Sequence, residues 1–239
     1  MKDRKKVPSA ECAFEVVSVT PVDADYAMTD LGATFAPLKS FLAAHPAEEF
    51  LVTNRACPCG GGRVRNIIHV ARRTLAKGAD PSFDAAWDRY KTGDDEYRNL
   101  HMKYLPALDK APWLLLSAVN VLGGSRPVIM GKGYLRQAHK VGSNYVEVSV
   151  DISSSAVARR IAGMILGYTS SLNVDEAFVL EAKEEADLPE RVLYQLRLSQ
   201  VDTNIAAADL DEAFYTGPKG IDGPGGDGPG GEGAPVAAD

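Results

Sequence analysis

Residues 145–172 read YVEVSVDISSSAVARRIAGMILGYTSSL and contain the clearest change of pattern in the chain. In the first eight residues, valine or isoleucine at every second position alternates with polar or aromatic residues, which predicts a strand with one buried face over 145–152. Three serines follow and supply helix-capping side chains. The apolar spacing after them predicts a helix over 156–172. This stretch therefore predicts a strand that leads directly into a helix.

The apolar residues of this stretch define a candidate binding surface. A helix that lies across a curved sheet leaves an apolar space between the two. The predicted buried face of the helix contains Val157, Ile161, Met164, Ile165 and Tyr168, with Gly163 and Gly167 one turn apart so that another backbone can approach. We expect ligand contacts from Val146, Val148 and Val150 on the strand and from Ile161, Ile165 and Tyr168 on the helix.

The start of the same helix has a second pattern, in which hydroxyls precede guanidinium groups. A helix N-terminus exposes unpaired N–H groups and a favourable dipole, so an anion such as a lipid phosphate can dock there. The residues concerned are Ser153, Ser154, Ser155 and Arg159. The alternative interpretation is that the serines only cap the helix while Asp151 or the helix start partners Arg159. The sequence leaves both open.

The rest of the chain mixes strand and helix signals. Runs rich in β-branched residues predict strands, and an Asp-Pro start at Asp80 predicts a helix cap. Asp94 is expected to cap a further helix that runs to Leu108 with a break at Pro106. The other predicted helices cover 37–45, 81–93 and 113–119, and the other predicted strands cover 14–22, 50–56, 64–74, 127–130, 134–138, 176–182 and 192–199.

This order lacks the regular strand–helix alternation of a parallel doubly wound sheet. It predicts an α+β fold with a curved, mainly antiparallel sheet packed against helices; a START-like helix-grip arrangement is one form of such a fold. From residue 216 the chain is dominated by Gly, Pro, Asp and Ala, which cannot bury enough apolar surface to order themselves. We therefore expect one domain over 1–215 and a disordered tail over 216–239.

Composition limits the possible partners and location. The net charge of −6 gives no support to nucleic-acid binding, which needs a basic surface. An odd number of cysteines, three, without a signal-peptide pattern indicates reduced thiols and a cytoplasmic protein. No apolar run approaches the roughly 20 residues that span a bilayer. Peripheral contact with endomembranes remains open.

Recognisable catalytic and metal-binding patterns are absent from the sequence. There is no Gly-x-Ser-x-Gly elbow and no Walker phosphate loop, and no acid–base pair stands out. Cys57 and Cys59 flank a proline, but a structural zinc site needs a second ligand pair. We therefore expect no enzymatic activity, no catalytic residue, no metal and no cofactor.

Several ordered segments carry a family resemblance. They are residues 5–8 (KKVP), 49–54 (EFLVTN), 93–99 (GDDEYRN), 103–106 (KYLP), 112–113 (PW), 144–159, 163–172, 181–185 and 188–190. In this order they resemble the C-terminal domain of the plant Enhanced Disease Resistance 2 family over about residues 1–202. That domain has no established function and often follows lipid-binding PH and START domains.

The resemblance implies a non-enzymatic module related to lipids or membranes. The residues themselves indicate only a large apolar core without a catalytic cluster. The leading hypothesis is an intracellular domain that holds a hydrophobic ligand, a lipid, between a curved sheet and the helix over 156–172. The alternative is a protein-interaction or regulatory scaffold whose interior is completely packed.

Overall fold

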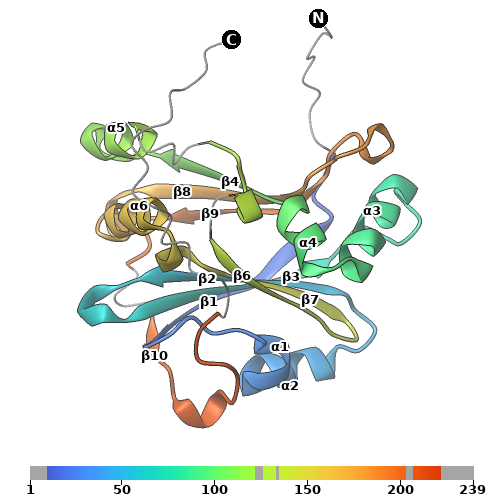
Figure 1. Ribbon diagram of the computed structural model, residues 1–239, viewed down its shortest axis with the longest axis horizontal. Helices are drawn as coiled ribbons and strands as arrows, with labels where there is room; N and C mark the ends of the chain where they lie inside the picture. The colour runs from blue at the N-terminus through green and yellow to red at the C-terminus, as the bar shows by residue number, and fades with distance from the viewer. Residues whose placement is uncertain (1–9, 122–125, 133–134, 203–206, 222–239) are drawn as a thin grey trace, which may run out of the picture.

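Two β-sheets form facing layers in the computed structural model, which describes residues 10–121, 126–132, 135–202 and 207–221 (Figure 1). The larger sheet has six strands in the order β10-β1-β3-β2-β7-β6, and the smaller has four in the order β5-β4-β8-β9. Neighbouring strands are antiparallel except for the β1–β10 and β2–β7 pairs. The bounds of the strands are β1 Phe14–Ala24, β2 Phe50–Pro58, β3 Val64–Arg73, β4 Met102–Asp109, β5 Val128–Ile129, β6 Arg136–Val141, β7 Tyr145–Asp151, β8 Asn173–Leu180, β9 Val192–Ser199 and β10 Ala208–Asp209.

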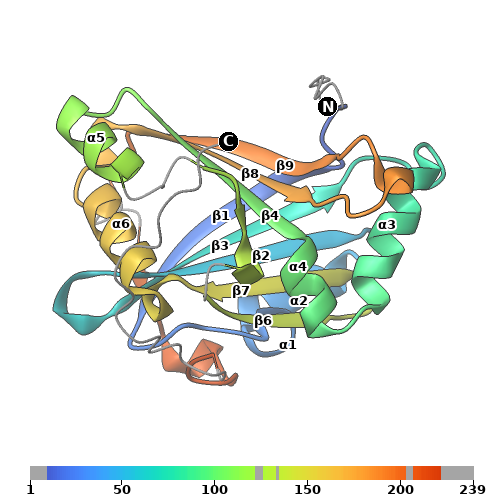
Figure 2. The ribbon, with the colours of Figure 1, turned by 45° about the horizontal axis from the view of Figure 1, so that its top comes forward.

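Helices cover the outer face of the larger sheet and both ends of the space between the sheets (Figures 1 and 2). Helices α1 and α2 lie beneath the larger sheet, α3 and α4 stand at one end, and α5 and α6 stand at the other. Their bounds are α1 Leu31–Thr34, α2 Ala36–Ala44, α3 Pro81–Thr92, α4 Asp95–His101, α5 Trp113–Val121 and α6 Ala156–Leu166. Short 3₁₀ turns include Ile152–Ser154 before α6 and Thr169–Ser171 after it.

The predicted α+β class is confirmed, with mainly antiparallel strands packed against helices. The open sheets agree with the expected START-like curved sheet. The two predicted helix caps are also confirmed. The Asp80 carboxylate accepts a hydrogen bond from the Phe83 amide at 3.1 Å, and the Asp94 carboxylate accepts one from the Tyr97 amide at 2.8 Å. These caps satisfy amides that the first turn of a helix leaves without partners.

The main core lies between the sheets at the α3 end. Aromatic residues of α3 stack in sequence, with ring centroids 6.3 Å apart for Phe83 and Trp87 and 5.6 Å for Trp87 and Tyr90. They pack against the inner faces of both sheets, including Leu51, Val148, Phe178 and Tyr194. A second core lies on the opposite face of the larger sheet, where α1 and α2 contribute Leu31, Leu38 and Leu42.

The helix predicted from Asp94 to Leu108 is wrong in its second half. Helix α4 ends at His101, and β4 follows directly. The apolar residues of this segment fit both a helical and an alternating spacing, and pairing with β8 selects the alternating one. Pro106 is compatible with β4 because β5 pairs only with Lys103 and Tyr104, which leaves β4 at the sheet edge beyond them.

The helix predicted over 156–172 is also shorter than expected. Helix α6 ends at Leu166, with Gly167 as its C-cap. Among the described residues, no neighbouring element packs closely against Gly163 or Gly167: a Cβ at Gly163 would meet nothing within 4 Å, and one at Gly167 would meet only carbonyl oxygens of its own helix. Both glycines are exposed.

The segment after Tyr215 is packed as far as Ile221, six residues beyond the boundary expected at 215. The Thr216 amide donates to the Thr34 carbonyl at 3.1 Å, and the Gly220 amide donates to the Ala27 carbonyl at 3.1 Å. Ile221 is buried against Ala27 and Ala56. The rest of the predicted tail, residues 222–239, lies outside the described residues.

Candidate ligand-binding cavity

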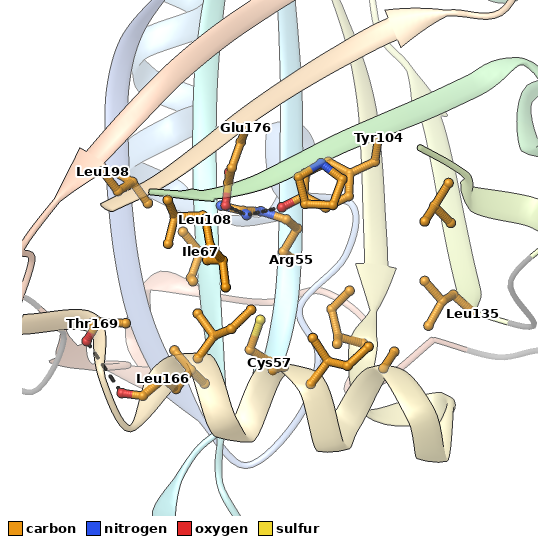
Figure 3. A pocket seen from close by; sticks show the side chains of 18 of the residues that line it. Arg55, Cys57, Ile67, Tyr104, Leu108, Leu135, Leu166, Thr169, Glu176 and Leu198 are labelled. Atoms are coloured by element: carbon orange, nitrogen blue, oxygen red, sulfur yellow. Dashed lines mark hydrogen bonds and ion pairs between the residues drawn. The ribbon is translucent and has the colours of Figure 1, made fainter. Parts of the chain in front are cut away.

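A cavity of about 660 Å³ lies between α6 and the inner faces of the two sheets (Figure 3). It occupies the end of the inter-sheet space opposite α3. Its wall is mostly aliphatic, with contributions from β1, β2, β3, β4, β8, β9 and α6. The apolar lining includes Val19, Pro21, Ile67, Pro106, Leu108, Leu135, Ile161, Ile165, Leu166, Leu172, Val174 and Leu198.

Helix α6 forms one wall because its apolar face points inward. Ile161 and Ile165, one turn apart, line the cavity, whereas Gly163 between them and Arg160 just before them are exposed. The Ser155 hydroxyl caps the helix by accepting from the Ala158 amide at 3.4 Å. Val157 lines the cavity and is still 52% exposed, so it lies at the opening.

Strand β4 forms part of the opposite wall. Alternate residues of a strand point to the same face, and Tyr104, Pro106 and Leu108 all line the cavity. They are paired in register with Phe178, Glu176 and Val174 of β8. Because a helix was predicted for this segment, the sequence did not indicate that β4 forms part of the cavity wall.

A small polar cluster interrupts the apolar wall opposite α6. The Arg55 guanidinium, from β2, donates through Nη1 to Glu176 Oε1, from β8. The same Nη1 lies 3.4 Å from the Tyr104 hydroxyl oxygen. Figure 3 shows these three side chains grouped together, across the cavity from the helix that carries Leu166. Arg55 and Glu176 are both buried.

A chain of hydrogen bonds holds Arg55 on the side that faces the packed core. Arg55 Nη2 lies 2.9 Å from His69 Nε2, and His69 Nδ1 lies 3.1 Å from the Tyr194 hydroxyl. The Tyr194 hydroxyl is 2.6 Å from Thr53 Oγ1. Because the guanidinium can only donate, His69 Nε2 must accept and Nδ1 carries the proton.

Burial and charge set the protonation states of this cluster. Burial, together with the nearby Arg55 cation, holds the pKa of His69 well below its usual value, so the ring is neutral. Burial opposes the charge of Arg55, but attraction to the Glu176 carboxylate outweighs it and raises the pKa of Arg55. Burial raises the pKa of the Cys57 thiol, which also lines the cavity, to about 11.

The interior is therefore arranged in successive layers along the strands. In the β2–β3 register, Leu51 pairs with Ala71 in the packed core, Thr53 with His69 in the polar layer, and Arg55 with Ile67 at the cavity. Strand β8 follows the same order, from Phe178 in the core through Glu176 to Val174 at the cavity. The polar layer separates the packed core from the cavity.

The structure brings together only part of the predicted ligand-binding set. Ile161 and Ile165 line the cavity, whereas Tyr168 is 46% exposed and is not part of its wall. Val146, Val148 and Val150 share one buried face, as predicted, but they belong to the packed core at the α3 end. None of these three valines is part of the cavity wall.

The predicted anion site consists of hydroxyls that already have partners in the protein. Ser153 donates to Asp151 Oδ1 at 2.5 Å, and Ser154 donates to the Asp151 carbonyl at 2.6 Å. Ser154 also accepts from the Arg136 amide at 2.9 Å, while Ser155 caps α6. Arg159 is exposed on α6. Of the three serines, Ser155 caps α6 as the alternative interpretation expects, whereas Ser153 and Ser154 bond Asp151 and the Arg136 amide.

The sequence interpretation did not identify Arg55, Tyr104 or Glu176 as site residues. One signal was available: β2 is buried along almost its whole length, yet its sequence FLVTNRACP contains Thr53, Asn54 and Arg55. Polar residues in a strand buried on both faces need specific partners. Those partners lie in distant parts of the chain, and the sequence does not identify them.

The part of the chain that the structure describes contains neither a metal-holding cluster nor a membrane-spanning helix. Among the residues that the structure describes, no three or more His, Cys, Asp or Glu side chains form a group able to hold a metal ion. The three cysteines are free thiols. Within the same described part of the chain, the helices are too short or too polar to cross a bilayer.

The fold and cavity define an α+β domain with an internal apolar site, and sequence comparison assigns its family. A sequence model described as "Protein ENHANCED DISEASE RESISTANCE 2, C-terminal" matches residues 1–202. The chain therefore belongs to the Enhanced Disease Resistance 2 C-terminal domain family, as its motifs predicted.

A curated relative from Arabidopsis thaliana, "Protein ENHANCED DISEASE RESISTANCE 2-like", is 36% identical over 124 residues. The match covers 50% of this chain and 16% of the relative's length, so the chain corresponds to a small part of that protein. No solved structure matches the chain.

Proposed function

We propose that this domain is a non-enzymatic module that binds one hydrophobic ligand, a lipid, in the cavity between α6 and the two sheets. The observation that carries the proposal is the cavity itself. Its volume of about 660 Å³ lies within the range of roughly 300–1,000 Å³ that is typical of small-molecule sites. Its wall is predominantly aliphatic, which suits a hydrocarbon ligand.

Packing energetics supports a ligand at this position. Protein interiors are normally filled to the density of organic crystals, and an unfilled apolar space forfeits contacts on all of its walls. The α3 end of the same inter-sheet space is filled by Phe83, Trp87 and Tyr90. A scaffold domain would be expected to fill the α6 end in the same way. A bound lipid would provide the missing contacts.

Membrane exchange of the ligand fits the exposed side chains beside the cavity. Val157 and Tyr168, on and just after α6, are 52% and 46% exposed, and Trp113 at the start of α5 is 77% exposed. Helices α5 and α6 share a small apolar cluster that includes Leu115, Val119 and Ile165. Exposed apolar side chains of this kind are found where proteins meet partners or membranes. We propose that this end contacts the membrane that supplies the lipid.

Native mass spectrometry of the purified protein tests ligand binding directly. We expect a fraction of molecules to carry one additional mass in the lipid range, which disappears after extraction with organic solvent. The delipidated protein is then expected to take up lipid from labelled liposomes. A protein that carries no lipid and takes none up would refute the proposal.

Filling the cavity with a side chain provides the matched test. In Ile165→Trp the larger side chain occupies ligand volume, so lipid uptake should fall at least about tenfold while stability changes by less than about 1.5 kcal/mol. The control, Gly163→Trp, adds an indole to the exposed face of the same helix and should retain uptake. If Ile165→Trp is instead destabilised by more than about 1.5 kcal/mol, within the range of up to about 3 kcal/mol that overpacking predicts, the space is already filled and the scaffold alternative is favoured.

A further inference from the structure

The stretch of chain that contains α5 and α6 is basic, although the protein as a whole has a net charge of −6. Between residues 110 and 174, the only carboxylate side chains in the sequence are those of Glu147 and Asp151, and both residues are buried. The same stretch has seven basic residues, namely Lys110, Arg126, Lys132, Arg136, Lys140, Arg159 and Arg160. It therefore adds cations, and no exposed carboxylate, to the surface of an acidic protein.

The arginines of this stretch differ from the other arginines in their surroundings. Every described arginine outside the stretch forms an ion pair with a carboxylate; these are Arg55, Arg63, Arg65, Arg72, Arg73, Arg89, Arg98, Arg191 and Arg197. Within the part of the chain that the structure describes, Arg126, Arg136, Arg159 and Arg160 have no such ion pair. Because no carboxylate of the described chain neutralises them, their charges can attract an anionic partner.

Helix α6 carries two of these arginines on its outward side. Arg159 and Arg160 are both exposed, and so are Ala156, Gly163 and Gly167 beside them. These three residues have small side chains or none. A flat surface can therefore approach the helix closely enough for both guanidinium groups to reach it.

Aromatic side chains are exposed at the same end of the molecule. Helices α5 and α6 lie next to each other there and share an apolar cluster (Figures 1 and 2). Trp113 at the start of α5 and Tyr168 just after α6 are exposed, and Lys110 is exposed shortly before α5. Tryptophan and tyrosine are the side chains that are enriched at membrane–water interfaces. Basic and aromatic side chains on one face are typical of proteins that lie on a membrane surface.

The cavity opens beside these arginines. Val157 lines the cavity, is half exposed, and lies two residues before Arg159 on the same helix. A surface that binds Arg159 and Arg160 therefore lies next to the opening. The serines at the start of α6 are engaged within the protein, so the attraction is to a charged surface and needs no phosphate pocket at the helix start.

We propose, on the basis of the lipid binding and membrane contact inferred above, that the α5–α6 face docks on a membrane surface that contains anionic lipids. This face is defined by Lys110, Trp113, Val157, Arg159, Arg160 and Tyr168. The cations attract the anionic surface, and the aromatic side chains enter the headgroup region. The cavity opening then lies against the bilayer that supplies the ligand.

Co-sedimentation of the whole chain with vesicles tests the docking. One set of vesicles is phosphatidylcholine alone, and the other contains roughly one third phosphatidylserine, which makes its surface anionic. We expect at least about tenfold stronger binding to the anionic vesicles at about 0.1 M salt. The preference should disappear at about 1 M salt, where the Debye length falls to about 3 Å. Equal binding to both vesicles would overturn the proposal. Binding to neither would also overturn it and would leave an acidic protein as the partner of this face.

Substitution of the two arginines links the preference to α6. Each cation near an anionic surface strengthens binding about fivefold, so Arg159→Gln with Arg160→Gln should bind anionic vesicles roughly thirtyfold more weakly. The matched control, Lys39→Gln with Lys183→Gln, removes the same charge from exposed positions on α2 and in the segment between β8 and β9. The control should bind as the wild type does. Equal weakening in the two double variants would show that net charge, and not this face, determines binding.

The two tryptophans of the chain report which face makes contact. Trp87 is completely buried in the core, whereas Trp113 is exposed on the proposed face. Anionic vesicles should shift the emission of Trp113 to shorter wavelength and protect it from aqueous acrylamide. Trp113→Phe should lack both changes, because Trp87 is already shielded. Vesicle binding that leaves the wild-type emission unchanged would contradict the assignment of this face.

Lipid uptake separates this proposal from the cavity function. With labelled liposomes, Arg159→Gln with Arg160→Gln should take up lipid from anionic liposomes at least about fivefold more slowly than the wild type does, since steering by charge raises association rates. It should reach the same final amount, because the cavity wall is unchanged. Uptake at equal rates from neutral and anionic liposomes would overturn only the docking proposal. A protein that docks on anionic vesicles but takes up no lipid would overturn the cavity function and leave the docking in place.

Discussion

His139 of β6 should make the protein less stable in weak acid. The side chain is buried, with its ring centroid 6.5 Å from that of Tyr90. Its Nε2 lies 2.7 Å from Asn99 Oδ1, which can only accept, so Nε2 carries the proton of the neutral ring. Among the described residues, Nδ1 has no hydrogen-bond partner. A second proton on Nδ1 would therefore create a buried charge without an acceptor.

The size of the effect follows from the pKa of His139 in the two states. Burial lowers this pKa from its ordinary value of 6.5 to about 4 in the folded protein, while the nearby Asp95 and Arg98 act in opposite directions. The unfolded chain therefore takes up the proton first as the pH falls. Stability is retained above about pH 6.5 and lost progressively down to about pH 4. The expected loss is about 2 kcal/mol at about pH 5 and about 3 kcal/mol at the limit.

Urea unfolding at about pH 7 and about pH 5 measures this loss. In His139→Gln, the side-chain amide can still donate to Asn99 but has no proton to gain. We expect the free energy of unfolding of this variant to fall by about 2 kcal/mol less than that of the wild type between the two pH values. His69, whose pKa is also lowered, is present in both proteins, so its contribution cancels. Equal losses in the two proteins would refute the reasoning.

Three further predictions concern local features of the fold. Gly163→Ala should raise the free energy of unfolding by up to about 1 kcal/mol, because the new methyl group meets no atom and the helix gains propensity; a lower urea midpoint would indicate an unseen contact. Asp80→Ala should lower the free energy of unfolding by about 1–2 kcal/mol, because it removes the cap of α3 and a partner of Arg191. Thermal unfolding measures this loss, and Asp80→Asn, which keeps a capping side chain, is the control. A chain that ends at Ile221 should keep the wild-type melting temperature. A chain that ends at Thr216 loses the buried Ile221 side chain, so its free energy of unfolding should fall by about 2 kcal/mol and its melting temperature should fall with it; equal melting temperatures would show that the segment 217–221 does not stabilise the fold.

Much of the fold could be predicted where local signals agree. Alternation over 145–152 and the caps at Asp80 and Asp94 depend on neighbouring residues, and the structure retains all three. The segment 102–109 could not be assigned in this way, because its apolar residues satisfy two periods at once. Only its pairing with β8, some 70 residues later in the chain, decides between them.

The cavity could be predicted only in part for a related reason. The alternation of β7 shows that Val146, Val148 and Val150 share a face, but the position of β7 in the sheet decides what that face meets. Likewise, Arg55 can be recognised as a site residue only from its contacts with Glu176, 121 residues away, and with His69. Ile161 and Ile165 of α6, which the periodicity of the helix places on one face, both line the cavity.

The pairing of β1 with β10 has a consequence for the synthesis of the protein. β1 precedes the other elements in the described chain, but the part of its edge at Val22 and Asp23 is covered only when these residues meet Ala208 and Asp209. The Tyr215 hydroxyl likewise bonds Thr29 across 186 residues. On the ribosome, this part of the β1 edge therefore remains open until nearly all of the domain has been translated. Contacts so distant in sequence favour slow folding, and an open strand edge is a site for aggregation. We expect the nascent chain to depend on chaperones that shield this edge until the segment 208–221 emerges.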